Sequence, residues 1–399
     1  MAEGLFAGLK VIDCASFIAA PAAATILSDF GADVIKVEPP GEGDLYRSLH
    51  TRPGSPTVNR DYAWILDNRN KRGLALDLKS ERGHEVLCRL VEKADVFITN
   101  MPFPVRRKLK TNYTDLAHLN PRLIYASFTA YGEDGPEAEK TGFDSTAYWA
   151  RSGLMDVVRP DADAVPARSS PGMGDHPSAV ALFGAIMTAL WRREKTGRGG
   201  QVDSSLVANG LWSNSYFVQA KMIGAEFPPR PKRTHVLNPL SNAYRCKDGR
   251  WFILSMVNEA RQYAPFMQAI GLEHLTAKYE VQMDRQTNSP ELIEIYDRVF
   301  SEKTLDDWRK ILDDAGITFG IVNTLDDILS DDQARHARVI VPFADGSGET
   351  ISSPFNIDGE TKRQPAAAPS IGQHTDEILR EYGYGDAEIR KLRDTRAVG

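Results

Sequence analysis

The chain has 399 residues, of which 42% are hydrophobic and 26% charged, so it can bury a large core. At roughly 150 residues per domain, this length suggests two or three domain-sized units. The net charge of −6 argues against nucleic acid as a partner, because phosphate binding needs a basic face. The longest apolar run, residues 179–191, is too short to cross a bilayer, so we expect no membrane partner either.

The cysteines and the N-terminal stretch indicate the compartment. Cys14, Cys88 and Cys246 lie far apart and have no metal-ligand spacing, so we expect buried free thiols and no metal site. The opening MAEGLFAGLK lacks the basic start and apolar core of a signal peptide. We therefore expect a protein of the cytoplasm.

The first part of the chain alternates short apolar strands with amphipathic helices, the pattern of a parallel α/β unit. The expected strands are residues 9–14, 33–38, 73–78, 95–100 and 122–128, and the expected helices are 21–32 and 80–94. Helical crossovers between such strands predict a doubly wound, Rossmann-like sheet that is covered on both faces.

Ligands of doubly wound sheets bind at the carboxyl ends of the strands. In this sequence those ends read ASFIAAP, EPPGEGD, TNMPFP and TAYGEDG. None of them is G-x-G-x-x-G, and the Walker-type G-x-x-x-x-G-K-[ST] is also absent from the sequence. A nicotinamide cofactor or a nucleoside triphosphate therefore has no support beyond the fold class.

The composition of the sequence changes near residue 225, where a proline- and cation-rich connection begins. A compact stretch follows, with an expected strand at 250–256, an expected helix at 259–272 and a helical stretch at 290–315. We predict a large Rossmann-like domain in residues 1–224, a smaller α+β domain in 225–330, and a return of the chain to the large domain in 331–399.

One short segment raises a question about chemistry. GMGD ends at Asp175, directly before an apolar helix with a stripe that includes Leu182, Ile186 and Leu190. Asp175 could cap this helix, and Pro177 suits a first turn. The positive end of the helix could equally hold the Asp175 carboxylate for chemistry. Asp203, in GGQVDSSL, is expected to be at most another cap.

Taken together, these motifs resemble family III CoA-transferases, the CaiB/BaiF family. The stretches that carry the resemblance are LKVIDCASFIAAPAAATILSDFGADVIKVEPPGEGD, LDNRNKRGLALDLK, ADVFITN, RLIYASFTAYGEDGP, GMGD, ALWRREKTGRGGQVDSSL and IGQHTDEILREYGY. Their order and spacing are more specific than any one of them. The resemblance implies an interlocked homodimer that moves CoA from an acyl-CoA to a small organic acid, with no tightly bound cofactor.

The family's nucleophilic aspartate matches Asp175. A carboxylate positioned there can attack a thioester, and the reaction then passes through an aspartyl anhydride and an aspartyl-CoA thioester. Gly172 and Gly174 lack side chains, so their N–H groups are expected to face a developing oxyanion. His176 is expected to be structural or exposed to solvent, because the exchange requires no proton transfer.

The resemblance also implies CoA contacts in loops at the strand ends. These residues are Ile18, Ala19, Asp67, Asn68, Arg69, Asn70, Lys71, Asn100, Met101, Pro102, Lys108, Thr141, Gly142, Phe143 and Asp144. Among the cations, Lys71, Arg72 and Lys108 could meet the CoA phosphates as point charges. Without the resemblance, the sequence favours ordinary turn positions for Asn68, Asn70 and Asn100.

The sequence departs from the formyl-transferring members of the family in three places. Ile18 replaces their glutamine, Pro39 stands where they have a CoA-contacting arginine, and THVLNPLSNAY occupies the region of their glycine-rich loop. Oxalate and formyl-CoA are therefore poor substrate candidates, and the acid stays open. Arg233 and His235, beside that loop, are weak candidates for a substrate contact.

Two other functions stay open at this point. An α-methylacyl-CoA racemase shares this fold, but the family's catalytic histidine lies in a G-H-D segment, and Phe143 takes its place here. Phenylalanine cannot accept a proton, which counts against the racemase. The other alternative is a CoA-binding protein that has lost its chemistry, and the acidic residue in GMGD disfavours it.

Overall fold

The structure is a computed structural model that describes residues 4–399. The chain divides into two compact units. The larger unit runs to Val157, resumes at Arg168–Ile223 and ends with Gln333–Gly399. The smaller unit takes Val158–Ala167 and Gly224–Asp332, so the chain enters it twice.

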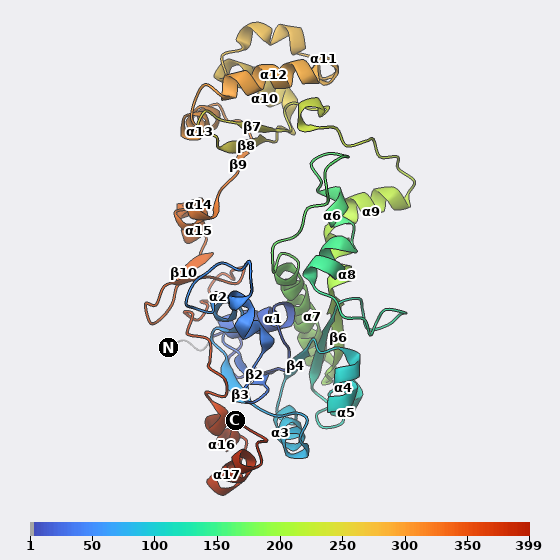
Figure 1. Cartoon of the computed structure of the whole chain (residues 1–399), viewed down its shortest axis with the longest axis vertical. Helices are drawn as coiled ribbons and strands as arrows, with labels where there is room; N and C mark the ends of the chain where they lie inside the picture. The colour runs from blue at the N-terminus through green and yellow to red at the C-terminus, as the bar shows by residue number, and fades with distance from the viewer. Residues whose placement is uncertain (1–3) are drawn as a thin grey trace. The chain divides into compact units, whose positions relative to one another are not determined.

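A parallel sheet of six strands forms the centre of the larger unit (Figure 1). Its strands are β1 (Lys10–Asp13), β2 (Asp33–Glu38), β3 (Arg72–Ala75), β4 (Val96–Thr99), β5 (Ile124–Thr129) and β6 (Gly200–Ser205). They lie in the order β3-β2-β1-β4-β5-β6, and every pair is parallel. This is the Rossmann strand order, with its switch point between β1 and β4.

Helices follow most of these strands in the larger unit. They are α1 (Ala19–Asp29), α2 (Tyr62–Asn68), α3 (Glu81–Val91), α4 (Phe103–Leu109), α5 (Tyr113–Leu116), α6 (Leu154–Val157), α7 (Asp175–Thr196), α8 (Leu206–Ser213), α9 (Ser215–Met222), α16 (Thr375–Glu381) and α17 (Asp386–Asp394). The larger unit also contains a 3-10 helix (Leu45–Thr51) and a π-helix (Asp144–Ala150). The strands β10 (Ile340–Pro342) and β11 (Glu349–Ile351) pair as a short antiparallel hairpin. The helix α15 (Asp332–His336) stands where the chain returns from the smaller unit.

Alternate side chains of the strands point into two separate cores. Val11 and Ala126 pack with α1 and α7 on one face of the sheet. Ile12 and Tyr125 pack with α3, α16 and α17 on the other face. Because both faces are covered, the strands are apolar on both sides, as a buried parallel sheet requires.

The C-terminal segment joins the outer edge of this sheet. The Gly73 N–H donates to His374 Nδ1 at 3.0 Å, and the Ala75 N–H donates to Thr375 Oγ1 at 3.2 Å. Val398 forms an isolated antiparallel bridge with Leu76. The last part of the chain is therefore built into the larger unit beside β3.

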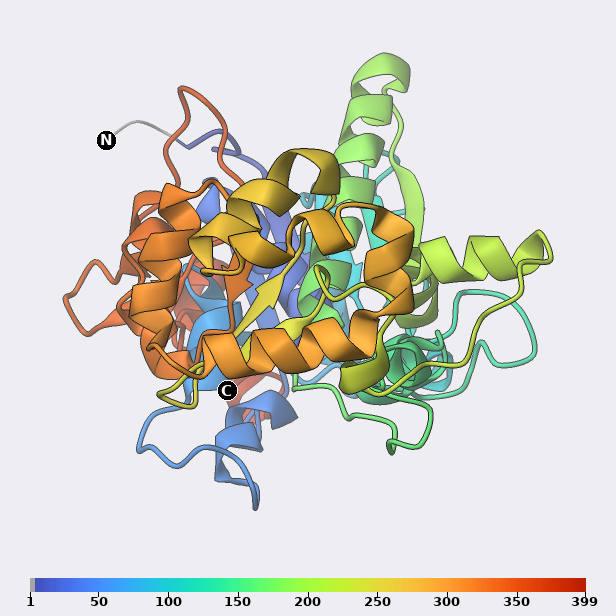
Figure 2. The ribbon, with the colours of Figure 1, turned by 90° about the horizontal axis from the view of Figure 1, so that it is seen from above.

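The smaller unit has its own antiparallel sheet and core. Its sheet is β7 (Ala243–Arg245), β8 (Trp251–Leu254) and β9 (Phe319–Ile321), and its helices are α10 (Glu259–Ala269), α11 (Gln282–Thr287), α12 (Ser289–Phe300), α13 (Leu305–Asp314) and α14 (Leu325–Leu329). Figure 2 shows these helices, yellow to orange, gathered around the short strands. Tyr244, Phe252 and Phe300 are fully buried between sheet and helices.

The predicted α/β class and the helical stretch at 290–315 are confirmed, and the prediction for Asp203 is wrong. The sequence interpretation missed β6, and Asp203 lies inside that strand instead of capping a helix. Residues 290–315 form two helices, because Thr304 caps a new helix with its side chain. The interlocked homodimer concerns a second copy of the chain and stays a prediction. Among the described residues, no helix is long and apolar enough to cross a membrane.

The cysteines are unpaired in the structure. Cys14 and Cys246 are buried, as expected, whereas Cys88 is half-buried. Burial raises the pKa of the Cys14 thiol to about 12, so this thiol stays protonated. Within residues 4–399, no group of three or more His, Cys, Asp or Glu side chains is arranged to bind a metal ion.

Buried charges connect the carboxyl ends of the central strands. Asp13, at the end of β1, contacts Lys71 Nζ at 2.8 Å and Lys36 Nζ at 3.7 Å. Lys36 also contacts Asp44 at 3.2 Å and donates to the Ala15 carbonyl. These side chains are almost completely buried, so each charge depends on its partners.

Replacing Asp13 should therefore destabilise the larger unit strongly. Asp13→Asn leaves two buried ammonium groups short of a negative partner, and the expected loss is about 3–5 kcal/mol of unfolding free energy. Asp376→Asn is the control, because it breaks a salt bridge with Arg393 that is about two-fifths exposed. It should cost less than about 1 kcal/mol. Urea denaturation measures both, and equal losses would contradict a structural role for the buried charges.

Candidate active site

A cavity of about 510 Å³ opens at the carboxyl ends of the central strands. Its walls come from the loops after β1, β2, β4 and β5, together with Asp175 at the start of α7. The loops after β1 and β4 flank the switch point of the sheet, where ligands of this architecture bind. All the residues that line the cavity belong to the larger unit.

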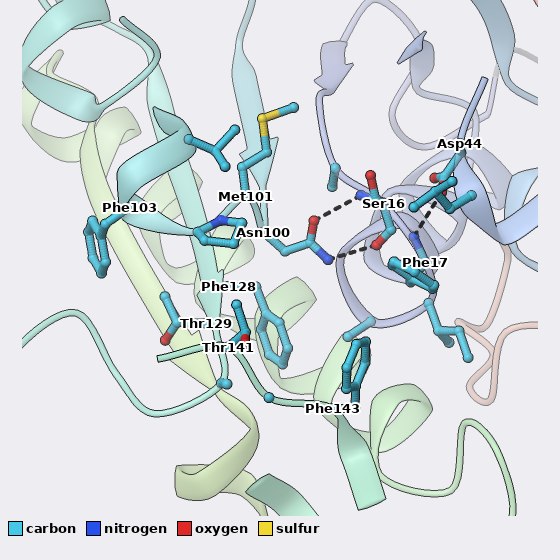
Figure 3. A pocket seen from close by; sticks show the side chains of 18 of the residues that line it. Ser16, Phe17, Asp44, Asn100, Met101, Phe103, Phe128, Thr129, Thr141 and Phe143 are labelled. Atoms are coloured by element: carbon cyan, nitrogen blue, oxygen red, sulfur yellow. Dashed lines mark hydrogen bonds between the residues drawn. The ribbon is translucent and has the colours of Figure 1, made fainter. Parts of the chain in front are cut away.

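Two hydrogen bonds fix the loop after β1 to the loop after β4. Asn100 Oδ1 accepts from the Ser16 N–H at 2.8 Å, and Asn100 Nδ2 donates to the Ser16 carbonyl at 2.7 Å (Figure 3). Next to Ser16, Phe17 takes a left-handed conformation with φ of 62°. A side chain other than glycine is strained there, so the surrounding contacts must hold the loop in place. Asn100 therefore shapes the cavity with its amide group.

Aromatic rings form one wall of the cavity. The rings of Phe17 and Phe143 meet edge to face with centroids 5.9 Å apart, and Tyr46 lies on the other side of Phe17 at 6.4 Å. Phe143 is 58% exposed, and Phe128 also lines the cavity. This wall offers apolar contact close to the carboxylate of Asp175.

Asp175 is the first residue of α7, and it does not cap the helix. The N-cap position is Gly174, and no side chain caps this end. The Asp175 carboxylate accepts no hydrogen bond from the part of the chain that the structure describes. Burial, reinforced by the nearby negative charge of Asp144, raises its pKa to about 7, while His176 opposes this rise. The sequence alternative of a simple cap is therefore wrong.

The two glycines before Asp175 are required by packing. Gly172 has a φ of 80°, and its N–H donates to Asp144 Oδ2 at 2.9 Å. The expectation that this N–H faces an oxyanion is therefore wrong. A Cβ on Gly174 would lie 2.5 Å from the ring of Tyr148, so a larger residue cannot fit. The N–H groups of Gly174 and Asp175 have no hydrogen-bond acceptor within residues 4–399, as is usual at the start of a helix.

The structure divides the expected CoA contacts into two groups. Those that line the cavity are Ile18, Ala19, Asn100, Met101, Pro102, Thr141, Gly142 and Phe143. Those that do not line it are Asp67, Asn68, Arg69, Asn70, Lys71, Lys108 and Asp144.

The segment from Asp67 to Lys71 holds the protein together instead of facing the cavity. Lys71 Nζ is buried and donates to Asp13, to Asn68 and to two backbone carbonyls. Arg69 forms a bidentate pair with Asp29. Lys71 therefore cannot meet a CoA phosphate as a point charge, and that expectation is wrong.

Arg72 and Lys108 are the other two cations that were expected to meet the CoA phosphates. Arg72 binds Asp33 through two hydrogen bonds and also binds Glu377 and Glu381. Its charge is already balanced by carboxylates, so it too is no free phosphate ligand. Lys108 is exposed on α4 but does not line the cavity.

Sequence reasoning missed several residues at the site. Lys140 lines the cavity and carries a half-exposed ammonium group 3.0 Å from Glu137. Its position directly before Thr141 is the only sequence signal that could have indicated it. His176, which is expected to be structural or exposed to solvent, has its Nε2 3.0 Å from Asp67 Oδ1, a partner that no sequence signal indicated. Only the fold brings α2 to the start of α7, so sequence spacing could not show this contact.

Comparison with known proteins identifies the family. The pattern described as CoA-transferase family III matches residues 6–375. The chain belongs to CoA-transferase family III. The crystal structure of a CaiB/BaiF family protein from Brucella suis has the same fold, with a TM-score of 0.85 and 27% identity over 95% of this chain and 100% of that chain.

Relatives with named activities span nearly the whole chain. A (R)-2-hydroxy-4-methylpentanoate CoA-transferase from Clostridioides difficile is 33% identical over 99% of each chain. A cinnamoyl-CoA:phenyllactate CoA-transferase from Clostridium sporogenes is 32% identical over 99% of this chain and 97% of its own. The mouse α-methylacyl-CoA racemase is 29% identical over 98% of this chain and 97% of its own. Membership of the family supports CoA transfer in general.

The raised pKa of Asp175 predicts how its replacement changes stability with pH. A carboxyl whose pKa is raised in the folded state contributes its full stability at low pH and loses it as pH rises through about 7. Asp175→Asn should therefore raise the melting temperature relative to the native protein at about pH 8.5, by roughly 2 °C or more. The gain should shrink at about pH 5, where the native carboxyl is protonated.

A matched control separates this effect from the helix position. Asp386 is also the first residue of a helix behind a glycine N-cap, but its side chain is 67% exposed. Asp386→Asn should give no gain at high pH, because its carboxylate favours the helix start. Thermal melts at both pH values measure this, and an equal gain for both variants would contradict the burial of charge at Asp175.

Proposed function

We propose that this protein transfers CoA from an acyl-CoA thioester to a free carboxylic acid, with Asp175 as the nucleophile. The observation that supports this most is the Asp175 carboxylate itself. It lines the cavity, accepts no hydrogen bond from the described residues and lies at the positive end of a 22-residue helix. A carboxylate that is positioned but not bound by partners is free to attack.

The first half of the reaction loads CoA onto the enzyme. An oxygen of Asp175 attacks the thioester carbonyl, the C–S bond breaks, and CoA thiolate leaves behind a mixed anhydride. The thiolate then attacks the Asp175 carbonyl carbon. The donor acid leaves with an oxygen that came from Asp175, and an aspartyl-CoA thioester remains.

The second half reverses these steps on the new acid. The acceptor carboxylate attacks the aspartyl-CoA thioester, releases thiolate and forms a second anhydride. Thiolate attacks the acyl carbon of the acceptor, and Asp175 returns to its free form with one oxygen from the acceptor. No net proton, electron or water is consumed over the cycle.

Groups of the larger unit suit the needs of these steps. Each tetrahedral intermediate carries an oxyanion, and the unpaired N–H groups of Gly174 and Asp175 are donors at the helix start. The anhydride and the thioester both react with water. The edge-to-face pair of Phe17 and Phe143 covers one side of the cavity with apolar surface, which favours the exclusion of water.

We also propose that the acid has an apolar side chain. Phe17, Phe128 and Phe143 line the same cavity as Asp175, and the lysine among the lining residues, Lys140, is already paired with Glu137 at 3.0 Å. The relatives named for 2-hydroxy-4-methylpentanoate and phenyllactate act on acids with branched or aromatic side chains. Both observations favour an acid of this class over a dicarboxylate.

Intact-protein mass spectrometry tests the nucleophile. The native protein is incubated with acetyl-CoA, and a covalent CoA adduct is expected. Asp175→Ala should form none, while the control Asp386→Ala, at the exposed helix start, should form the same amount as the native protein. An adduct of undiminished yield in Asp175→Ala would contradict the proposal.

The rate at which each acid discharges the same CoA adduct then identifies the preferred acceptor. Phenyllactate and 2-hydroxy-4-methylpentanoate should discharge it faster than succinate or glutarate do. A preference for the dicarboxylates would overturn the proposed acid class without affecting the nucleophile.

The racemase is the second candidate, because a racemase is among the relatives. A racemase must remove the proton α to the thioester with a base. Phe143 takes the place of the histidine in the G-H-D segment, and its ring packs edge to face on Phe17. A phenyl ring has no site for a proton, so this position supplies no base.

Exchange in heavy water distinguishes the two activities. The native protein should incorporate no deuterium at the α carbon of a 2-methylacyl-CoA under conditions in which it exchanges CoA. Mass spectrometry of the recovered thioester measures this. Deuterium incorporation by a protein that shows no CoA exchange would favour the racemase.

A further inference from the structure

The imidazole of His176 is held at both of its nitrogens. His176 follows Asp175 in the first turn of α7, and its side chain is 43% exposed. Its Nε2 lies 3.0 Å from Asp67 Oδ1, at the end of α2. Its Nδ1 lies 3.1 Å from the carbonyl oxygen of Gly172, on the loop before α7.

Both partners of this ring accept hydrogen bonds. A carbonyl oxygen has no proton to donate, and a carboxylate has none when it is ionised. The other oxygen of Asp67 accepts a hydrogen bond from the Tyr46 hydroxyl at 2.6 Å, so both oxygens of this carboxylate face donors. A neutral imidazole has one N–H and could satisfy only one of its two partners. The ring satisfies both when each nitrogen carries a proton, which makes it an imidazolium.

We propose that His176 is a positioning residue, an imidazolium held between Asp67 and Gly172, and that its positive charge keeps the adjacent Asp175 ionised. This inference rests on the proposed role of Asp175 as the nucleophile. His176 itself touches no reacting atom in this scheme. It acts through the charge state of its neighbour and through the loop that precedes it.

The charges around Asp175 and His176 explain why a cation is needed beside Asp175. Asp175 faces two further carboxylates, Asp67 and Asp144, and both disfavour its ionised form. Tyr46 stays protonated, since burial and Asp67 raise its pKa far above the usual range. Lys71 Nζ donates to the backbone carbonyl of Asp67 at 2.8 Å and forms its ion pair with Asp13. Of the three side chains Asp67, Asp144 and His176, His176 is the one that favours the ionised form of Asp175.

The ring also holds the shape of the loop. A Cβ on Gly172 would lie 2.9 Å from the imidazole ring, so the ring fills the space beside this turn. The Gly172 N–H is bound by Asp144, and its carbonyl faces His176. His176 and Asp144 therefore fix the two sides of the same peptide segment, three residues before the nucleophile.

The pH dependence of turnover separates a charge effect from simple packing. In His176→Gln an amide replaces the cation, so the pKa of Asp175 should rise, and the acid limb of the kcat/KM profile should move up by about one pH unit. At pH values below the acid limbs of both proteins, kcat/KM of His176→Gln should be about tenfold lower than that of the native protein. At pH values above both limbs it should stay within about threefold of the native value. The control is His118→Gln, an exposed histidine outside the cavity, which should leave the limb in place. A loss in His176→Gln that is equal at every pH would overturn the inference.

A second measurement needs no activity and no variant. Ring-nitrogen NMR shifts of His176 in the resting native protein, assigned through the backbone resonances of the same residue, should show both nitrogens protonated at about pH 7.5. A neutral ring with one unprotonated nitrogen at that pH would overturn the inference even if the variant failed to fold. Absence of CoA exchange in the native protein would instead refute the proposed function, and the ring shifts would still decide the state of His176.

Discussion

A carboxylate that must stay ionised beside two other carboxylates is the constraint on which this site depends. Asp175 lies partly buried at the start of α7, with Asp67 and Asp144 close enough to disfavour its charge. Burial raises the pKa of Asp175 and so favours its protonated form. The helix start and the neighbouring imidazole oppose this, so the first turn of α7 has to be placed accurately against α2 and the π-helix.

That placement depends on buried ion pairs behind the cavity. Asp13, Lys36 and Lys71 lie at or near the ends of β1, β2 and α2, and with Asp44 they make two buried carboxylates against two buried ammonium groups. Lys71 also binds the carbonyl of Asp67, and so it connects this network to the carboxylate that holds His176. Lys71, which seemed suited to a phosphate, thus helps to position the residues around Asp175.

The sequence predicted the architecture better than the roles of single charges. Apolar periodicity located five of the six central strands, because buried parallel strands are continuous hydrophobic runs. It missed β6, whose GQVDSS is polar and only partly buried at the edge of the sheet. Spacing cannot show that Lys71 points inward to Asp13, or that Asp67 meets His176, since both contacts join segments far apart in the chain. The family resemblance indicated Asp175, and the structure then showed that its carboxylate caps no helix.

The oxygen atoms of Asp175 offer the most direct test of the central claim. The acceptor acid is supplied with both carboxylate oxygens heavy, and the protein is digested after many turnovers. The peptide that carries Asp175 should gain heavy oxygen, because each cycle returns one acceptor oxygen to this side chain. If the acid is converted to its CoA thioester while that peptide keeps its natural oxygen, the acid never formed an anhydride with Asp175, and the account is wrong.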